Sequence, residues 1–151
     1  MGTSSLTGND TVTINGRNLT DFGDGDILDI TFPNELVAVK KGKNQNSIFA
    51  YSEDGTLVNV SIRLIRSSPD DKFINSLRIS MKQDFSAFSL ITADFVKRVG
   101  DGLGNVSREI YALTGGVFAK ESDTKSNTSG DTDQAVSIYN FTFTNGEKTI
   151  A

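Results

Sequence analysis

The chain contains 151 residues, a length that favours one domain with a hydrophobic core of its own. It contains neither Cys nor His, which excludes disulfides, thiol nucleophiles, zinc sites of the Cys/His type and every catalytic relay that needs His. The formal net charge of −4 argues against tight binding to free nucleic acid, because phosphate contacts need clustered Lys and Arg.

No apolar run approaches the roughly 18 residues of a membrane-spanning helix, and no secretory signal opens the chain. We therefore expect a protein made in the cytoplasm, without a membrane partner. The first ten residues are mostly Thr, Ser, Gly and Asn, with Leu6 as their one large apolar side chain after the initiator Met. This composition predicts a flexible N-terminal arm over residues 1–10 and a single domain over residues 11–151.

The domain begins with a predicted hairpin. Val12 and Ile14 alternate with Thr, and Asn15-Gly16 is a strong signal for a type I′ turn. The return strand is expected over residues 19–22.

Four further strands are predicted over residues 26–32, 36–40, 48–51 and 58–64. The last has the cleanest alternation, with apolar side chains on one face (Val58, Val60, Ile62 and Leu64) and polar ones on the other (Asn59, Ser61 and Arg63). One buried and one polar face is typical of an antiparallel sheet.

A helix is predicted over residues 69–83. Ser68 is a suitable N-cap, Pro69 suits the first helical position, and Asp70 and Asp71 favour the positive end of a helix. Apolar residues then recur at helical spacing, as Phe73, Ile74, Leu77 and Met81. We expect this helix to lie on the sheet.

The rest of the chain returns to strands. These are expected over residues 88–99, 106–113 and 135–144, with a turn at 101–105, a polar loop at 121–134 and a second turn at Asn145-Gly146. Gly115-Gly116 indicates a bulge or a close approach of backbone. The sequence thus predicts a mainly β fold of eight or nine strands with one helix.

Several motifs that occur in enzymes are present, but each lacks the other residues that its chemistry needs. Asp21-Phe22-Gly23 matches a kinase triplet, but the other kinase motifs are absent. Gly100, Gly102 and Gly104 lack the following helix and Lys of a phosphate-binding loop. Paired carboxylates can hydrolyse glycosides, but the chain has no Trp to stack on a sugar. We expect no enzyme and no cofactor.

Charged residues gather in two places. Residues 21–35 hold five acidic and no basic side chains, among them Asp21, Asp24, Asp26 and Asp29. Their spacing does not fit a calcium loop, so an acidic surface is favoured over a metal site. Lys40, Lys41 and Lys43 form the one basic run. It is interpreted either as a solvated loop tip or as a contact with acidic residues of a neighbouring copy.

Several segments resemble tail-tube proteins of contractile-tailed bacteriophages, which share their fold with the type VI secretion tube protein. The resemblance lies in residues 12–17 (VTINGR), 19–26 (LTDFGDGD), 41–46 (KGKNQN), 64–71 (LIRSSPDD) and 146–151 (GEKTIA). It spans most of the chain and weakens over residues 85–135.

The resemblance implies an antiparallel β-sandwich or partial barrel with one flanking helix near residues 69–83. Six subunits would form a ring, and rings would stack into a tube with an acidic lumen, through which DNA passes without specific binding. Asp21, Asp24, Asp26 and Asp29 are the candidates for this acidic lumen or for an acidic outer surface, and the sequence does not say which of them face the channel. Sheath protein would surround the tube, and baseplate and tail-terminator proteins would bind its ends. Such a subunit assembles in the host bacterial cytoplasm and resides in the virion tail. Leu6, Lys40, Lys41 and Lys43 are then the candidate contacts between subunits.

The alternative is a monomeric β-sandwich that binds carbohydrate or protein, such as a fibre or baseplate accessory domain. It would need an exposed aromatic cluster, for which Tyr51, Tyr111 and Tyr139 are the candidates. An enzyme is the least favoured of the three.

Overall fold

The computed structural model describes residues 5–6, 10–22, 28–42, 46–51, 56–121, 123–124 and 135–151. Their elements are β1 (Ser5–Leu6), β2 (Thr11–Ile14), β3 (Arg17–Leu19), β4 (Leu28–Thr31), β5 (Val37–Lys41), β6 (Ser47–Tyr51), β7 (Val58–Ile65), α1 (Pro69–Gln83), η2 (Phe85–Ala87), β8 (Ile91–Gly100), β9 (Val106–Phe118), β10 (Asp123–Thr124) and β11 (Val136–Ile150).

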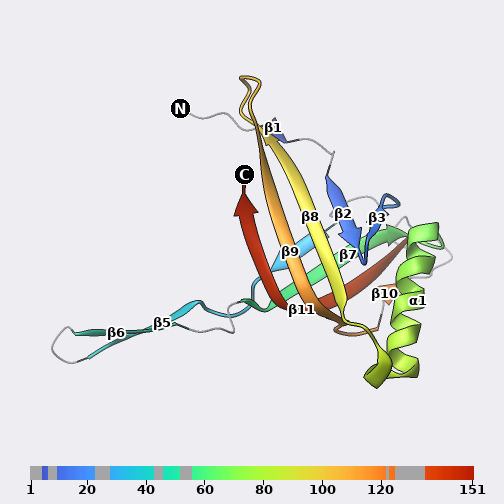
Figure 1. The fold of residues 1–151 in the computed structure, drawn as a ribbon, viewed down its shortest axis with the longest axis horizontal. Helices are drawn as coiled ribbons and strands as arrows, with labels where there is room; N and C mark the ends of the chain where they lie inside the picture. The colour runs from blue at the N-terminus through green and yellow to red at the C-terminus, as the bar shows by residue number, and fades with distance from the viewer. Residues whose placement is uncertain are drawn as a thin grey trace.

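Nine of the strands form one antiparallel sheet in the order β3-β2-β8-β9-β11-β7-β4, with β1 beside β8 and β10 beside β11. The sheet curls into a half-barrel, and α1 lies where β7 ends and β11 begins (Figure 1). The predicted mainly β fold, a partial barrel with one flanking helix, is confirmed. Strands β5 and β6 form a separate two-stranded sheet.

The core fills the concave side of this sheet. The alternation predicted for residues 58–64 is confirmed in β7, where Val58, Val60, Ile62 and Leu64 are all buried. Ile74 of α1 is fully buried in the same core, and Phe73, Leu77 and Met81 pack against it; the helix bounds are the ones that the sequence predicts. Burial of these apolar side chains is the main stabilising contribution.

The predicted first hairpin is confirmed, with a type I′ turn in which Asn15 and Gly16 both have positive φ. Its return strand is β3, however, so it begins at Arg17 and ends at Leu19, earlier than predicted. Phe22 instead forms an isolated bridge with Leu64 of β7.

The predicted turn at Asn145-Gly146 is wrong. Strand β11 runs through both residues, and Asn145 pairs with Thr114 and Gly146 with Leu113 of β9. Gly146 is required by crowding: a Cβ there would lie 2.4 Å from Cγ2 of Val58 and 2.5 Å from Cδ2 of Leu113. The sequence signal of a turn therefore marks a place where the strand passes tightly over the core.

The expected bulge at Gly115-Gly116 is confirmed. The register between β8 and β9 shifts there, since Ile91 pairs with Gly116 but Ala93 pairs with Leu113. Gly115 has φ 66°, and a Cβ on Gly116 would lie 2.4 Å from the Phe143 ring. The glycines thus let an otherwise continuous β9 bend over β11.

Two other boundaries differ from the sequence prediction. Strand β8 begins at Ile91 rather than residue 88, because the one-turn helix η2 and an extended stretch precede it. Within the predicted loop 121–134, Asp123–Thr124 form the short strand β10, paired with Ile138 and Ser137 of β11. Residues 122 and 125–134 lie outside the described residues.

Candidate assembly surfaces

The hairpin of β5 and β6 is the most exposed ordered element. It projects away from the half-barrel (Figure 1), and every residue of both strands is exposed. Phe49 and Tyr51 are each 70% exposed, and Val39 is 59% exposed. A lone two-stranded hairpin is at best marginally stable in water, so this one needs a surface to pack on.

The two faces of this hairpin differ in chemistry. Directly paired residues share a face, and the pairs Val37–Tyr51 and Val39–Phe49 place two β-branched and two aromatic side chains on one side. We call this the aromatic face. The opposite face carries the pairs Ala38–Ala50 and Lys40–Ile48.

Two of the three predicted lysine contacts fall on this hairpin. Lys40 and Lys41 belong to β5, paired with Ile48 and Ser47, so the strand extends into the segment that the sequence assigned to a polar loop. The pair Lys41–Ser47 follows the pair Val39–Phe49 at an interval of two residues, so Lys41 lies on the same side as the aromatic face, nearer the tip of the hairpin. Lys43 lies outside the described residues.

The N-terminal arm contributes one described element. Ser5 pairs with Gly100 and Leu6 with Val99, which places β1 along the far end of β8. The role of Leu6 between subunits stays a prediction, as does the division into arm and domain.

Strand β11 has a long, partly open edge. It pairs with β7 over Val136–Phe143 and with β9 over Phe141–Ile150. In the described part of the chain, residues 145–150 therefore have a strand on one side only. Such an edge presents unpaired N–H and C=O groups, which another strand can pair.

A cavity of about 450 Å³ opens between the two margins of the curled sheet, with β4 on one side and β2, β8 and β9 on the other. Its apolar walls are Val12, Leu28, Ile30, Phe95 and Tyr111. We call it the seam cavity.

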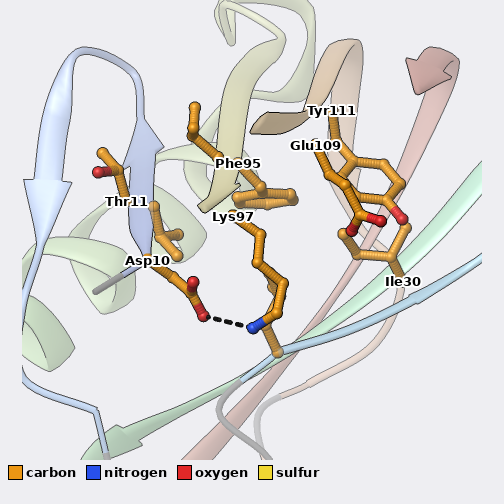
Figure 2. Close-up of a pocket in the computed structure, with 10 residues that line it drawn as sticks. Asp10, Thr11, Ile30, Phe95, Lys97, Glu109 and Tyr111 are labelled. Carbon is orange, nitrogen blue, oxygen red and sulfur yellow. Dashed lines mark hydrogen bonds and ion pairs between the residues drawn. The ribbon is translucent and has the colours of Figure 1, made fainter. Parts of the chain in front are cut away.

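Two ion pairs lie at the rim of the seam cavity. Lys97 Nζ lies 3.1 Å from Asp10 Oδ2 (Figure 2), and Lys148 Nζ lies 3.7 Å from Glu109 Oε1 and 5.7 Å from the centre of the Tyr111 ring. The second oxygen of Asp10, Oδ1, is buried and has no hydrogen-bond partner among the residues that the structure describes. A buried acceptor without a donor costs about 1–3 kcal/mol.

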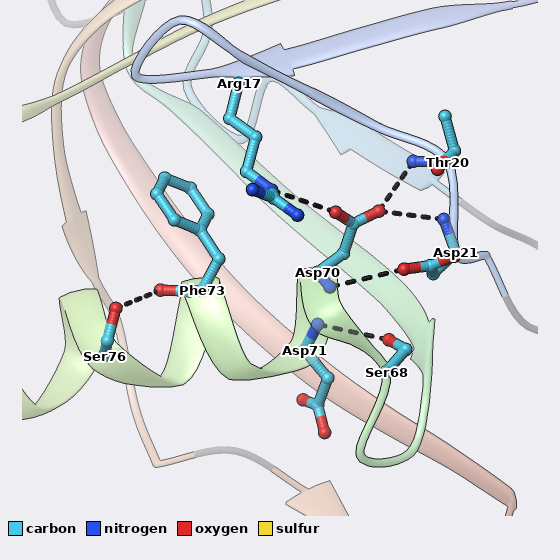
Figure 3. Close-up of polar contacts among 8 residues, drawn as sticks. All are labelled: Arg17, Thr20, Asp21, Ser68, Asp70, Asp71, Phe73 and Ser76. Carbon is cyan, nitrogen blue, oxygen red and sulfur yellow. Dashed lines mark hydrogen bonds and ion pairs between the residues drawn. The ribbon is translucent and has the colours of Figure 1, made fainter.

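Asp70 is the most deeply buried charged residue among those described, at 2% exposure. Its Oδ2 accepts hydrogen bonds from the amides of Thr20 (2.6 Å) and Asp21 (2.9 Å), and its Oδ1 accepts one from Arg17 Nε (3.0 Å) (Figure 3). Burial raises the pKa of Asp70, but these hydrogen bonds and the Arg17 charge outweigh it and hold the pKa below its usual value. Through these hydrogen bonds, the Asp70 carboxylate connects the first hairpin and the residues that follow it to the start of α1.

The predicted acidic residues do not gather into one site. Asp21 is half-buried, and its Oδ2 accepts a hydrogen bond from the amide of Asp70 at 3.3 Å, so it caps α1 (Figure 3). Asp29 is exposed on β4, opposite Ser61 of β7. Asp24 and Asp26 lie outside the described residues.

The three tyrosines do not form an exposed cluster. Tyr139 is buried in the core, Tyr111 lines the seam cavity, and Tyr51 is exposed on the projecting hairpin. This arrangement removes the feature that the monomeric binding module needs.

Within the described ranges, no three Asp or Glu side chains converge as a metal site would require, and no helix combines the length and apolar character needed to cross a membrane.

Sequence reasoning missed several functional features. In the sequence, Asp70 looks like one of the acidic residues that commonly occupy the first turn of a helix, and nothing marks it as a buried acceptor of hydrogen bonds. The sequence shows the alternation of Val37 and Val39 in one strand and of Phe49 and Tyr51 in the other. Only the pairing of the two strands shows that these four side chains share one face.

Comparisons with known proteins were made by sequence and by fold. No protein-family model and no curated protein matches the sequence. The fold is similar to a chain in the cryo-EM structure of the anti-feeding prophage cap (the AFP tube terminating cap), with TM-score 0.63 and 10% identity over 97% of this chain and 92% of that one.

Two chains of an extracellular contractile injection system, PVC, are similar as well, each with TM-score 0.53 over 94% of this chain. One comes from the sheath-tube complex in the extended state, at 10% identity over 87% of its length. The other comes from the sheath/tube terminator in the extended state, at 12% identity over 92% of its length. At these identities the likeness is one of fold.

Proposed function

We propose that the chain is a structural subunit of the tube of a phage-like contractile tail. Identical copies form hexameric rings, and the rings stack into a hollow conduit inside a sheath, with baseplate and tail-terminator proteins at its ends. The work of such a subunit is mechanical and uses neither a catalytic group nor a cofactor. The fold shared with components of a tube-terminating cap and a sheath-tube complex supports the proposal.

The observation that carries the proposal is the projecting hairpin of β5 and β6. Its aromatic face leaves Phe49, Tyr51 and Val39 in water, which is unfavourable for an isolated molecule. Contact with another copy removes this surface from water. A subunit that completes its packing only on assembly is what a tube requires.

The partly open edge of β11 supports the same proposal. Residues 145–150 offer backbone groups to a neighbouring strand, and a closed ring pairs such edges instead of leaving them exposed. Joined sheets would form a continuous inner wall.

The proposed lumen is acidic. An acidic wall repels DNA phosphates, so that a genome slides through the tube without sticking. Asp29, exposed on β4, is the described residue that best suits such a surface.

A tube-terminating ring is the second candidate, because two of the similar structures named above are a tube-terminating cap and a sheath/tube terminator. The two candidates differ in growth. A tube subunit stacks without limit, whereas a terminating ring stops at one layer.

Light scattering after size exclusion, with negative-stain microscopy over a concentration series, tests the proposal. Rings that extend into tubes support the first candidate, and single rings support the second. Compact monomers at every concentration, also after mixing with tail-initiation components, would contradict both. Glycan binding by such a monomer would favour the accessory-domain alternative.

A further inference from the structure

We propose that Arg98 and Arg108 form a binding site for a doubly charged phosphate group, such as a phosphate monoester or a diphosphate. The site lies on β8 and β9, close to the turn over residues 101–105. It is formed within one copy of the chain, so it goes beyond the proposed function and does not depend on it.

The two arginines lie side by side on neighbouring strands. Arg98 of β8 pairs directly with Arg108 of β9, and both residues are exposed. The two strands run together as far as the pair Gly100–Val106 (Figure 1). Directly paired residues share a face of the sheet, with Cβ atoms about 4.5–5.5 Å apart. Both guanidinium groups can therefore reach the same ligand.

The face that carries the two arginines is the one opposite the core. Side chains alternate between the faces of a strand, and Phe95 of β8 is buried in the core, so Arg98, three positions later, lies on the other side. The neighbours of the two arginines on that face, two positions away along each strand, are all uncharged: Val96, Gly100, Val106 and Ile110.

Neither arginine has a carboxylate partner among the residues that the structure describes. Glu109, which follows Arg108 in the chain, lies on the opposite face and pairs with Lys148. Asp101 accepts three hydrogen bonds from other residues of the turn. Five other basic side chains do form ion pairs with carboxylates: Arg17, Arg78, Lys82, Lys97 and Lys148. Within the described ranges, Arg98 and Arg108 therefore lie together without a counter-charge.

The charge of the pair identifies the ligand. Like charges directly opposite each other destabilise a sheet, and an anion bound between the two guanidinium groups removes that repulsion. A carboxylate has one charge, and its two oxygens are matched by one guanidinium. A phosphate monoester has a charge of about −1.5 to −2 at neutral pH and further acceptor oxygens, so it can bind both guanidinium groups at once.

Equilibrium dialysis of the full chain against labelled pyrophosphate at low salt tests the site, because it measures bound ligand per chain in monomers and assemblies alike. Arg98→Gln and Arg108→Gln should each raise the dissociation constant at least about tenfold, since each removes charged hydrogen bonds to the ligand. Lys72→Gln removes the same charge from an exposed position on α1 and should leave the constant within about twofold. Equal effects of the three substitutions would mean that pyrophosphate responds to net charge alone, and would overturn the site.

Competition against labelled pyrophosphate tests the class of ligand. Succinate carries its two charges on separate carboxylates, so it should compete at least about tenfold less well than unlabelled pyrophosphate. Equal competition by succinate would overturn the assignment to phosphate. An oligonucleotide without terminal phosphates carries one charge per phosphodiester and should also compete less well. Stronger competition by the oligonucleotide, at equal phosphate concentration, would overturn the assignment to a doubly charged group and identify a nucleic-acid strand as the ligand.

Thermal unfolding separates binding from a structural role of Arg98. R98Q should melt no lower than wild type without ligand, because it removes a repulsion, and pyrophosphate should raise the melting temperature of wild type only. A lower melting temperature for R98Q, with no effect of pyrophosphate on wild type, would overturn the inference. Rings and tubes that form without binding pyrophosphate would leave the proposed function standing. Monomers that bind it and never assemble would overturn the proposed function alone.

Discussion

The Tyr139 hydroxyl donates a 2.5 Å hydrogen bond to Oδ1 of Asp71, and so joins the beginning of β11 to the first turn of α1. Oδ2 of Asp71 accepts hydrogen bonds from the Ser67 amide at 2.8 Å and from the Ser137 hydroxyl at 3.4 Å. The carboxylate therefore links the turn before α1, the helix itself and the last long strand.

Replacing Tyr139 by Phe should destabilise the monomer by about 1–3 kcal/mol, because a buried carboxylate loses a donor while the packing of the ring is kept. Urea unfolding measures the change. Tyr111→Phe, whose hydroxyl has no such partner among the described residues, is the control. An unchanged midpoint for Tyr139→Phe would show that the hydrogen bond contributes nothing to stability.

The same contact should make the protein less stable at alkaline pH. Burial, and then the hydrogen bond and charge of Asp71, hold the pKa of Tyr139 well above its usual value of 10.0. Above about pH 10 the unfolded chain releases this proton and the folded chain keeps it, so the free energy of unfolding falls as the pH rises. The decrease should be smaller in Tyr139→Phe, which unfolding at a series of pH values will measure.

Asp70→Asn should lower the free energy of unfolding by about 1.5–3 kcal/mol, since a charged acceptor of three hydrogen bonds becomes neutral. The pKa of Asp70 is below its usual 3.8 in the folded chain, so its contribution is complete above that pH and is lost as the pH falls through the lowered value. The stability curves of wild type and D70N should therefore converge in acid. Curves that stay parallel down to pH 2 would contradict this role.

Gly146→Ala should destabilise the fold by about 1–3 kcal/mol, because its Cβ would overlap Val58 and Leu113 in a packed core. Thermal unfolding measures the loss. Gly42→Ala is the matched control, since its Cβ would meet only Asn46 O at 3.6 Å, an ordinary contact. Equal melting temperatures for the two variants would mean that the strand shifts to accommodate the methyl group.

Ser61→Pro should prevent folding. Strand β7 lies between β11 and β4, so its backbone is paired on both sides, and Pro removes an N–H from that ladder at a cost of about 3 kcal/mol or more. Ser61→Ala keeps the backbone and is the control. A native circular dichroism spectrum from S61P would contradict the central position of β7.

Reversing the charge of Lys40, Lys41 and Lys43 together should weaken assembly in a manner that depends on salt. A charged contact with acidic groups of a neighbouring copy is strongest at low ionic strength and is screened as salt rises. Light scattering across a salt series will show whether the difference from wild type narrows. A difference that is the same at every salt concentration would exclude an electrostatic contact.

The sequence by itself determined the local structure. Ser68-Pro69 with acidic residues after it fixes the start of α1, Asn15-Gly16 fixes the first turn, and strict alternation fixes β7, because each signal depends on neighbouring residues only. The absence of Cys and His likewise restricted the chemistry before any fold was known.

Only the tertiary structure decided the matters that depend on distant partners. Asn145-Gly146 has the composition of a turn, yet β9 pairs with it, so the strand continues through it. Asp70 meets Arg17 across 53 positions of sequence, and the seam cavity exists because a sheet built from separate segments does not close. Such contacts arise from the order and curl of the strands, which a local pattern of residues does not encode.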